Sequence, residues 1–218
     1  MAKALYVEEK DLNRIFKIAA VSGEFTVRNV ALLTTIYGTG MMLTEVATLP
    51  LKAYLKPDGA VLVDSEVPAE IAYNGNARPV KWMSKRLIET VDAYLAYRVE
   101  HRHRVTTRAG AFRGLDPDAP IFLTDEGAPY KLTERRTATG TISYSCDSLN
   151  QLYRRLHTQA GIEGANAMSA RRTFAIRMSK KADLKTVKIA LGLKTLRAAR
   201  NLIDSDPVRL GAIAAGVF

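Results

Sequence analysis

The sequence has 218 residues, enough to bury a hydrophobic core without disulfides or metals, and its apolar fraction of 47% excludes a disordered chain. Charged residues interrupt the first thirty residues and every long apolar run, so we expect no signal peptide, no membrane span and a cytoplasmic protein. Because 32 Lys and Arg stand against 22 Asp and Glu, the formal net charge is +10, which favours a phosphate polymer or an anionic membrane as partner.

Hydrophobic residues at helical spacing predict three helices in the first fifty residues. A leading helix covers residues 7–20, and a buried helix covers residues 28–37. The turn Gly38-Thr39-Gly40 ends the buried helix. A short third helix then runs through Glu45 and stops near Pro50, because proline cannot continue a helix.

The middle of the chain has the pattern of a small antiparallel sheet. Val61-Leu62-Val63 predicts a strand, and Asn74-Gly75 predicts a hairpin turn between residues 70–73 and residues 78–82. Ser84 is expected to cap the amphipathic helix that follows. Residues 98–119 carry five arginines and several turn-forming residues, which indicates a basic surface loop.

The last hundred residues predict one more short strand and then helices. The strand is Ile121-Phe122-Leu123, and the next helix covers residues 148–160, with Tyr153 on its core face and His157 on its surface. Cys146 has no partner for an internal disulfide and no metal-ligand spacing, so we expect it to pack in the core. Further helices are expected over residues 169–181, 184–191 and 196–203.

No repeat and no linker divides the chain, which favours a single domain over residues 1–218. We expect a leading helix within residues 1–24, a core over residues 25–205 and a C-terminal tail over residues 206–218. Basic residues concentrate near the end of this core, where residues 171–200 hold ten Lys and Arg against one acidic residue, Asp183. Such a one-sided distribution favours a phosphate-binding surface over an ordinary solvated helix face.

Four stretches of the sequence follow one another in the same order as the conserved segments of a known protein family. They are a Thr-Gly turn followed by a Thr-Glu pair within residues 28–45, a strand and helix start at 77–87, a short segment at 121–132, and a basic helical end at 168–200. Together they resemble the catalytic domain of the tyrosine recombinases, the phage-integrase family. The resemblance implies a mainly helical α+β fold with a small antiparallel sheet. About twenty-five residues precede the core, too few for the separate core-binding domain of longer family members.

The resemblance also implies a reaction in which a tyrosine hydroxyl attacks a phosphodiester while two arginines bind the phosphoryl oxygens and a lysine and a histidine move protons. Of these roles, only the second arginine is retained, at Arg171. The hairpin lysine position falls near Tyr73 or Asn74. The first arginine, the two histidine positions and the nucleophile fall on apolar residues, namely Met42, Met168, Leu193 and Leu202. We therefore expect a protein that does not cut DNA and needs no metal, cofactor or small-molecule substrate.

Double-stranded DNA is the expected partner, because positive charge persists where the resemblance places the DNA surface. Arg171 and Arg172 are expected to contact phosphates, together with Lys85 and Arg86. Residues able to read base edges lie on the helix over 148–160, although each has an equally good interpretation as an ordinary polar surface residue. These are Asn150, Gln151, Arg154 and Arg155, and weaker phosphate candidates are Lys185, Lys188, Lys194 and Arg197.

Two functions remain open at this point. The protein is a regulator or accessory factor of a bacterial mobile element that holds DNA at the nucleoid without cutting it. Alternatively, it is a non-catalytic subunit of a recombination complex in which another subunit supplies the tyrosine, and its protein partners would be further copies of itself or an active recombinase. Binding to RNA is a weaker interpretation, because no aromatic stacking surface is evident in the sequence.

Overall fold

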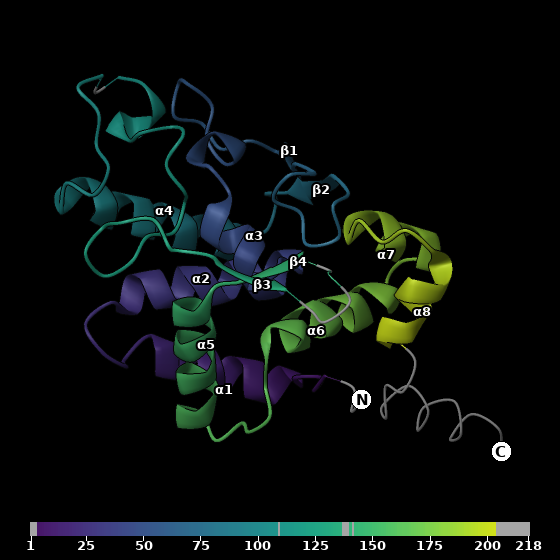
Figure 1. The fold of residues 1–218 in the computed structure, drawn as a ribbon. Coiled ribbons are helices and arrows are strands. Elements are labelled where there is room, and N and C mark those ends of the chain that lie inside the picture. Colours follow the sequence, from purple (N-terminus) through teal and green to yellow (C-terminus); the bar gives the residue numbers. More distant parts are fainter. Residues whose placement is uncertain (1–3, 109, 137–139, 141, 204–218) are drawn as a thin grey trace, which may run out of the picture.

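The computed structural model describes residues 4–108, 110–136, 140 and 142–203, and this part of the chain is mainly helical with two two-stranded antiparallel sheets. The helices are α1 (Glu9–Ala19), α2 (Thr26–Thr39), α3 (Leu43–Thr48), α4 (Lys85–Glu100), α5 (Asp147–Gln159), α6 (Ala167–Ser179), α7 (Leu184–Ala190) and α8 (Leu196–Ile203) (Figure 1). The strands are β1 (Asp64–Val67), β2 (Arg78–Lys81), β3 (Thr133–Arg136) and β4 (Ile142–Ser145). This architecture confirms the predicted fold class.

Helix α2 runs through the centre of the molecule and packs against α1, α4 and α6 (Figure 1). Its residues from Ala31 to Tyr37 are all buried, so the helix is buried on every side rather than on one face. A second, smaller hydrophobic cluster holds α7 and α8 against the end of α6. The molecule therefore has a main core around α2 and a separate apolar contact beneath its C-terminal helices.

The predicted helices are confirmed, with ends that differ by one to a few residues. The cap at Ser84 is also confirmed, since its hydroxyl accepts a hydrogen bond from the Leu87 N–H at 3.5 Å. Both Tyr153 and Cys146 are fully buried, as expected. Periodicity was sufficient for helices such as α1 and α5, each of which buries one continuous face.

The strand predictions are wrong in three places. Strand β2 pairs with β1, with Ser65 opposite Val80, and not with residues 70–73. The Tyr73 N–H instead donates to the Glu45 carboxylate at 3.0 Å, so this segment is a loop. Residues 61–63 precede β1 rather than forming a strand, and residues 121–123 are buried without belonging to a sheet.

The expected basic loop begins later than predicted, because Arg98 lies in the last turn of α4 and is fully buried. Its guanidinium donates to the carbonyl oxygens of Pro120 at 3.0 Å and Ile121 at 2.9 Å, so it anchors the following segment to the helix. Arg113 is partly buried and pairs with Asp92 at 2.8 Å. The exposed arginines of this segment are Arg102, Arg104 and Arg108.

A second hairpin, formed by β3 and β4, was not predicted. The predicted C-terminal tail at 206–218 lies outside the described residues, and the single-domain assignment stays a prediction. Within the part of the chain that the structure covers, no helix is both long and apolar enough to cross a bilayer.

Candidate functional site

The turn after α2 fixes the geometry of the site. Gly40 has a left-handed backbone with φ of 65°, and a Cβ atom placed there would lie 2.7 Å from the Phe174 ring and 2.8 Å from Leu191. Only glycine fits both the backbone angle and the close packing. The chain then enters α3, where the Glu45 carboxylate accepts a hydrogen bond from the Met42 N–H at 3.0 Å.

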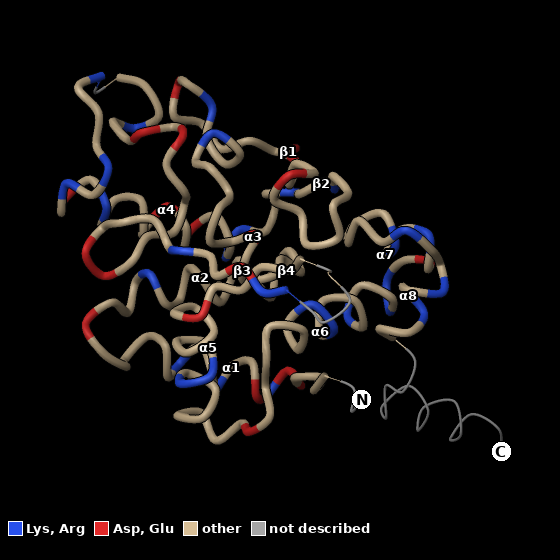
Figure 2. Tube along the Cα trace, in the orientation of Figure 1, with Lys and Arg blue, Asp and Glu red and all other residues tan. Residues whose placement is uncertain are grey.

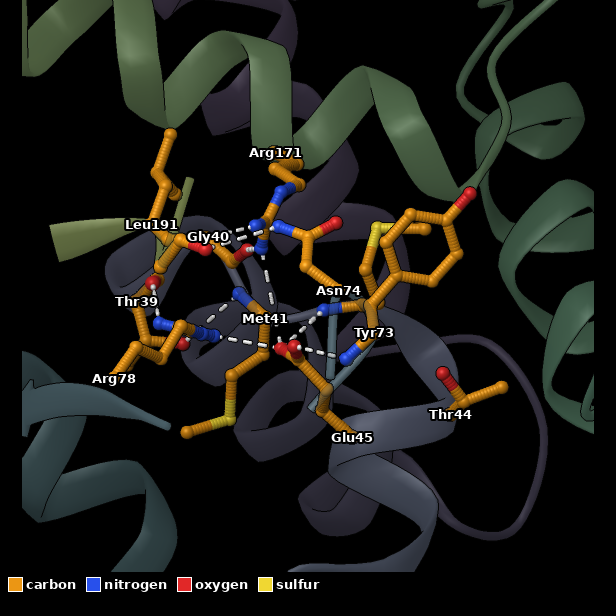
Figure 3. Close-up of polar contacts among 12 residues, drawn as sticks. Thr39, Gly40, Met41, Thr44, Glu45, Tyr73, Asn74, Arg78, Arg171 and Leu191 are labelled. Atoms are coloured by element: carbon orange, nitrogen blue, oxygen red, sulfur yellow. Dashed lines mark hydrogen bonds and ion pairs between the residues drawn. The ribbon is translucent and has the colours of Figure 1, made fainter. Parts of the chain in front are cut away.

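Glu45 is the centre of a buried polar cluster (Figure 3). Its carboxylate lies 2.7 Å from Arg78 Nη2 and 4.0 Å from Arg171 Nη1, and all three side chains are at most 2% exposed. Burial alone would raise the pKa of Glu45, but Arg78, Arg171 and the Tyr73 N–H hold it below its ordinary value. The carboxylate is therefore ionised and shared between two guanidinium groups.

Both arginines also bind backbone carbonyls at the end of α7. Arg171 donates to the carbonyl oxygen of Gly40 at 2.9 Å and to that of Leu191. Arg78 donates to Thr39 O at 3.3 Å and to Ala190 O at 3.1 Å. Each guanidinium thus joins the turn after α2 to the C-terminal carbonyls of α7, which a helix leaves without internal partners.

The loop between β1 and β2 completes this end of α7. The side-chain amides of Asn76 and Asn74 donate to the Gly192 carbonyl at 3.2 Å and 3.4 Å. Burial lowers the pKa of the Arg171 guanidinium to about 10, although Glu45 opposes the shift, so the side chain is still cationic near neutral pH. These contacts favour a structural role for Arg171 over the predicted phosphate contact.

Arg172 is also turned into the protein. Its side chain is 7% exposed, with Nε 3.1 Å from Leu202 O and Nη1 bonded to Ala4 O. The residue therefore ties the start of the chain and α8 to α6. As for Arg171, this geometry favours a structural role over the predicted contact with phosphate.

Four of the positions to which the resemblance assigns chemistry have apolar side chains, and two of these four lie at the small apolar cluster rather than at Glu45. Met42 is buried, whereas Met168 is partly exposed at the start of α6. Leu193 and Leu202 pack against the small apolar cluster beneath α7 and α8. Tyr73 is 51% exposed and lies beside Asn74 in the loop over the site (Figure 3).

The expectation that His157 lies on the surface is wrong. His157 is 1% exposed, with Nδ1 2.7 Å from Tyr153 O and Nε2 2.7 Å from Tyr37 Oη. Because a carbonyl only accepts, Nδ1 carries the proton and Nε2 accepts from the Tyr37 hydroxyl, which lies 2.8 Å from that of Tyr153. Burial lowers the pKa of His157 to about 4, so the imidazole is neutral.

Exposed positive charge lies on α5 and on the α7–α8 end of the molecule (Figure 2). On α5, Gln151, Arg154 and Arg155 are exposed and Asn150 is half-buried, opposite the buried face of the helix. The exposed candidates near the C-terminus are Lys185, Lys194 and Arg197, and Lys188 is half-buried.

Lys85 and Arg86 are exposed at the start of α4, but each has a partner within the protein. Lys85 lies 3.9 Å from the Glu89 carboxylate, and the Arg86 guanidinium lies 4.1 Å from the centre of the Phe16 ring. Neither contact buries the charge, so both stay available to a ligand. Among the described residues, no group of three or more His, Cys, Asp and Glu has the arrangement of a metal site.

No protein-family model matches the sequence, and no curated protein matches it. Solved structures do match the fold. The XerA recombinase superimposes with a TM-score of 0.70 at 16% identity over 99% of this chain and 64% of its own. XerH site-specific recombinase bound to its palindromic difH substrate, in a post-cleavage complex, gives 0.64 at 18% identity, over 98% of this chain and 53% of its own.

The Tn1549 transposon integrase in complex with transposon right end DNA gives a TM-score of 0.60 at 14% identity, over 98% of this chain and 67% of its own. This chain thus spans between about half and two thirds of the length of these three proteins. The TM-scores establish a shared fold, that of the tyrosine-recombinase catalytic domain. Because the identities are low, the likeness shows the fold alone.

Proposed function

We propose that this chain binds double-stranded DNA on an integrase-like fold without cutting it, as a regulator or accessory factor of a mobile element. The main support for the loss of cleavage is the set of contacts that Arg171 makes within the protein. Both of its terminal nitrogens bind backbone carbonyls, and the side chain is 2% exposed. An arginine in this arrangement directs both terminal nitrogens at carbonyls of the protein, where a catalytic arginine would direct them at a phosphate.

The rest of the site supports the same conclusion. Covalent cleavage needs a nucleophile, and the position to which the resemblance assigns it is Leu202. Proton transfer needs ionisable groups, and the matching positions are Met168 and Leu193. Loss of one preorganised phosphate donor costs about 10²- to 10³-fold in rate, whereas loss of the nucleophile removes the covalent pathway altogether.

Binding rests on the exposed charge that surrounds this inactive site. The net charge of +10 provides long-range attraction to a phosphate polymer. On α5, Gln151, Arg154 and Arg155 point away from the core and are the residue types that form paired hydrogen bonds with base edges. The exposed charges at the C-terminal end, Lys185, Lys194 and Arg197, provide phosphate contacts. Arg171 and Arg172 no longer belong to this set.

The first experiment separates holding from cutting. The protein is mixed with nicked suicide substrates and with intact duplexes of the same sequence, and the products are resolved under denaturing conditions. We expect a salt-sensitive complex with the duplexes and no covalent adduct. A denaturant-resistant adduct would overturn the non-catalytic assignment, and no binding at low salt would overturn DNA binding.

The second experiment tests the surface. Replacing Arg154 and Arg155 together with Ala should lower affinity and flatten the dependence of the logarithm of the binding constant on that of the salt concentration by about 0.9 per lost phosphate contact. Lys17→Ala, an exposed charge on α1, is the matched control. Equal binding by both variants would remove α5 from the interface. Adding an active recombinase to the suicide-substrate assay tests the alternative role as a subunit, which predicts more covalent adduct in the mixture than with the recombinase alone.

A further inference from the structure

The β3–β4 hairpin is exposed on both faces, unlike β1–β2. All four residues of β3 are exposed, as are Ile142, Ser143 and Tyr144 of β4, while Ser145 is half-buried. An isolated two-stranded hairpin is only marginally stable in water, because it has no core of its own. This ribbon therefore depends on the contacts that hold its base.

The base of the ribbon is held by polar contacts with the first turn of α5. Ser145 Oγ lies 2.8 Å from Asp147 Oδ1, and Arg135 bridges the two with Nη2 3.0 Å from Asp147 and Nε 3.1 Å from Ser145. The hydrogen bond from Ser145, followed by the charge of Arg135, lowers the pKa of Asp147, so this anchor is ionised. Ribbon and α5 are thus joined as one projecting unit.

The strand register shows which side chains stay open. Glu134 lies opposite Tyr144 and Arg136 opposite Ile142, and alternation puts these four on one face, which we call the open face. Arg135 is on the other, anchored face. On the open face Tyr144 is 54% and Ile142 46% exposed, and Arg136 makes a solvent-exposed ion pair with Glu134 at 3.0 Å.

The position of the ribbon also matters. Strand β4 lies against α3, the helix that begins at the site around Met42 and Glu45 (Figure 1). The ribbon is therefore next to the surface that a duplex would cross on its way past the site and α5. Its described residues carry two positive charges, Arg135 and Arg136, against one negative charge, Glu134, and the flanking Lys131 and Asp147 add one charge of each sign.

We propose that the open face of the β3–β4 ribbon enters the major groove of double-stranded DNA, a proposal that rests on the proposed function. The major groove is about 12 Å wide and admits a two-stranded β-ribbon. Arg136 provides paired donors for a guanine edge or a phosphate, and Ile142 provides apolar contact of the kind a thymine methyl accepts. The excess positive charge favours DNA over a protein partner. A protein partner would have only the two half-exposed apolar residues to contact, which is too small an apolar surface for stable binding.

Three variants test this assignment by their opposite effects. Arg136→Ala and Tyr144→Ala should each lower affinity for duplex DNA, the first by about tenfold with a flatter salt dependence. Glu134→Gln should raise affinity, because it releases Arg136 from its only charged partner on the open face. Since the Glu134–Arg136 ion pair is exposed, the melting temperatures of all three variants should stay close to that of the unmodified chain.

The readouts are titration of labelled duplex at several salt concentrations and methylation interference at guanine N7. Lys17→Ala again serves as the charge control. If the unmodified chain binds duplex and the three variants bind identically to it, the ribbon proposal is overturned while the proposed function stands. If the unmodified chain does not bind at all, the proposed function itself has failed. Variants that change self-association in sedimentation but not DNA affinity would assign the open face to a second copy and also overturn the proposal.

Discussion

The buried imidazole of His157 makes the stability of the fold depend on pH in a defined window. In the folded protein its pKa is lowered to about 4, whereas the ordinary value is 6.5. Between these two pH values, His157 is therefore protonated in the unfolded chain and neutral in the folded chain. Stability from this residue is complete above the unfolded value, falls as the pH drops below 6.5, and stops falling below about 4.

The size of the effect follows from the shift. A pKa difference of this size corresponds to about 3.4 kcal/mol at its limit, and the loss between roughly pH 7 and pH 5 is about 2 kcal/mol. His157→Gln removes the titrating group while keeping a polar side chain next to Tyr37. The variant should be less stable than the unmodified chain near neutral pH and should lose less stability on acidification.

Urea unfolding at about pH 7 and pH 5, followed by circular dichroism, gives the free energy of unfolding for both proteins. The difference between their two pH-dependent losses isolates His157 from the carboxylates and the other histidines, which both proteins share. If the unmodified chain and His157→Gln lose the same free energy between the two pH values, the neutral buried tautomer is wrong.

Two other substitutions test the site. Arg171→Ala should lower the free energy of unfolding by about 3 to 5 kcal/mol, because it leaves Glu45 with one partner fewer, and should leave the salt dependence of DNA binding unchanged; a flatter salt dependence in a folded variant would return Arg171 to the interface. Leu202→Tyr should yield no covalent adduct with a suicide substrate, because Met42, Met168 and Leu193 still lack the groups that bind phosphate and move protons; an adduct at the new tyrosine would show that the remaining site suffices.

Helices were the predictable part of this fold, because helices such as α1, α4 and α5 show their buried face as a repeating pattern in the sequence. Strand pairing was not, because it depends on distant partners. The Asn74-Gly75 turn was a reasonable hairpin signal, but the Tyr73 N–H binds Glu45, a residue far away in the sequence. The β3–β4 hairpin was missed because β3 contains no apolar residue, so only the four residues of β4, with Ile142 and Tyr144 before serines, show the alternation that identifies a strand.

For the candidate site as well, the sequence predicted some features and not others. Motif spacing singled out Met42, Arg171 and Leu202. In the structure the first two both contact Glu45, whereas the Leu202 carbonyl accepts from Arg172, the neighbour of Arg171. Sequence alone did not show that Arg171 binds carbonyls, because a guanidinium suits a phosphate and a helix end equally well. His157 was predictable in principle, since it follows the buried Tyr153 by four residues and so lies on the same side of α5.

The separate apolar cluster beneath α7 and α8 has a consequence for how the molecule opens. These two helices join the body through that small contact and through side-chain donors from Arg78, Arg171 and two asparagines, while the main core lies elsewhere. Detaching them breaks few apolar contacts, so it needs less free energy than unfolding α2. Backbone amides of residues 184–203 should exchange with deuterium earlier than those of α2, and the exposed lysines of this segment would then move as a hinged arm.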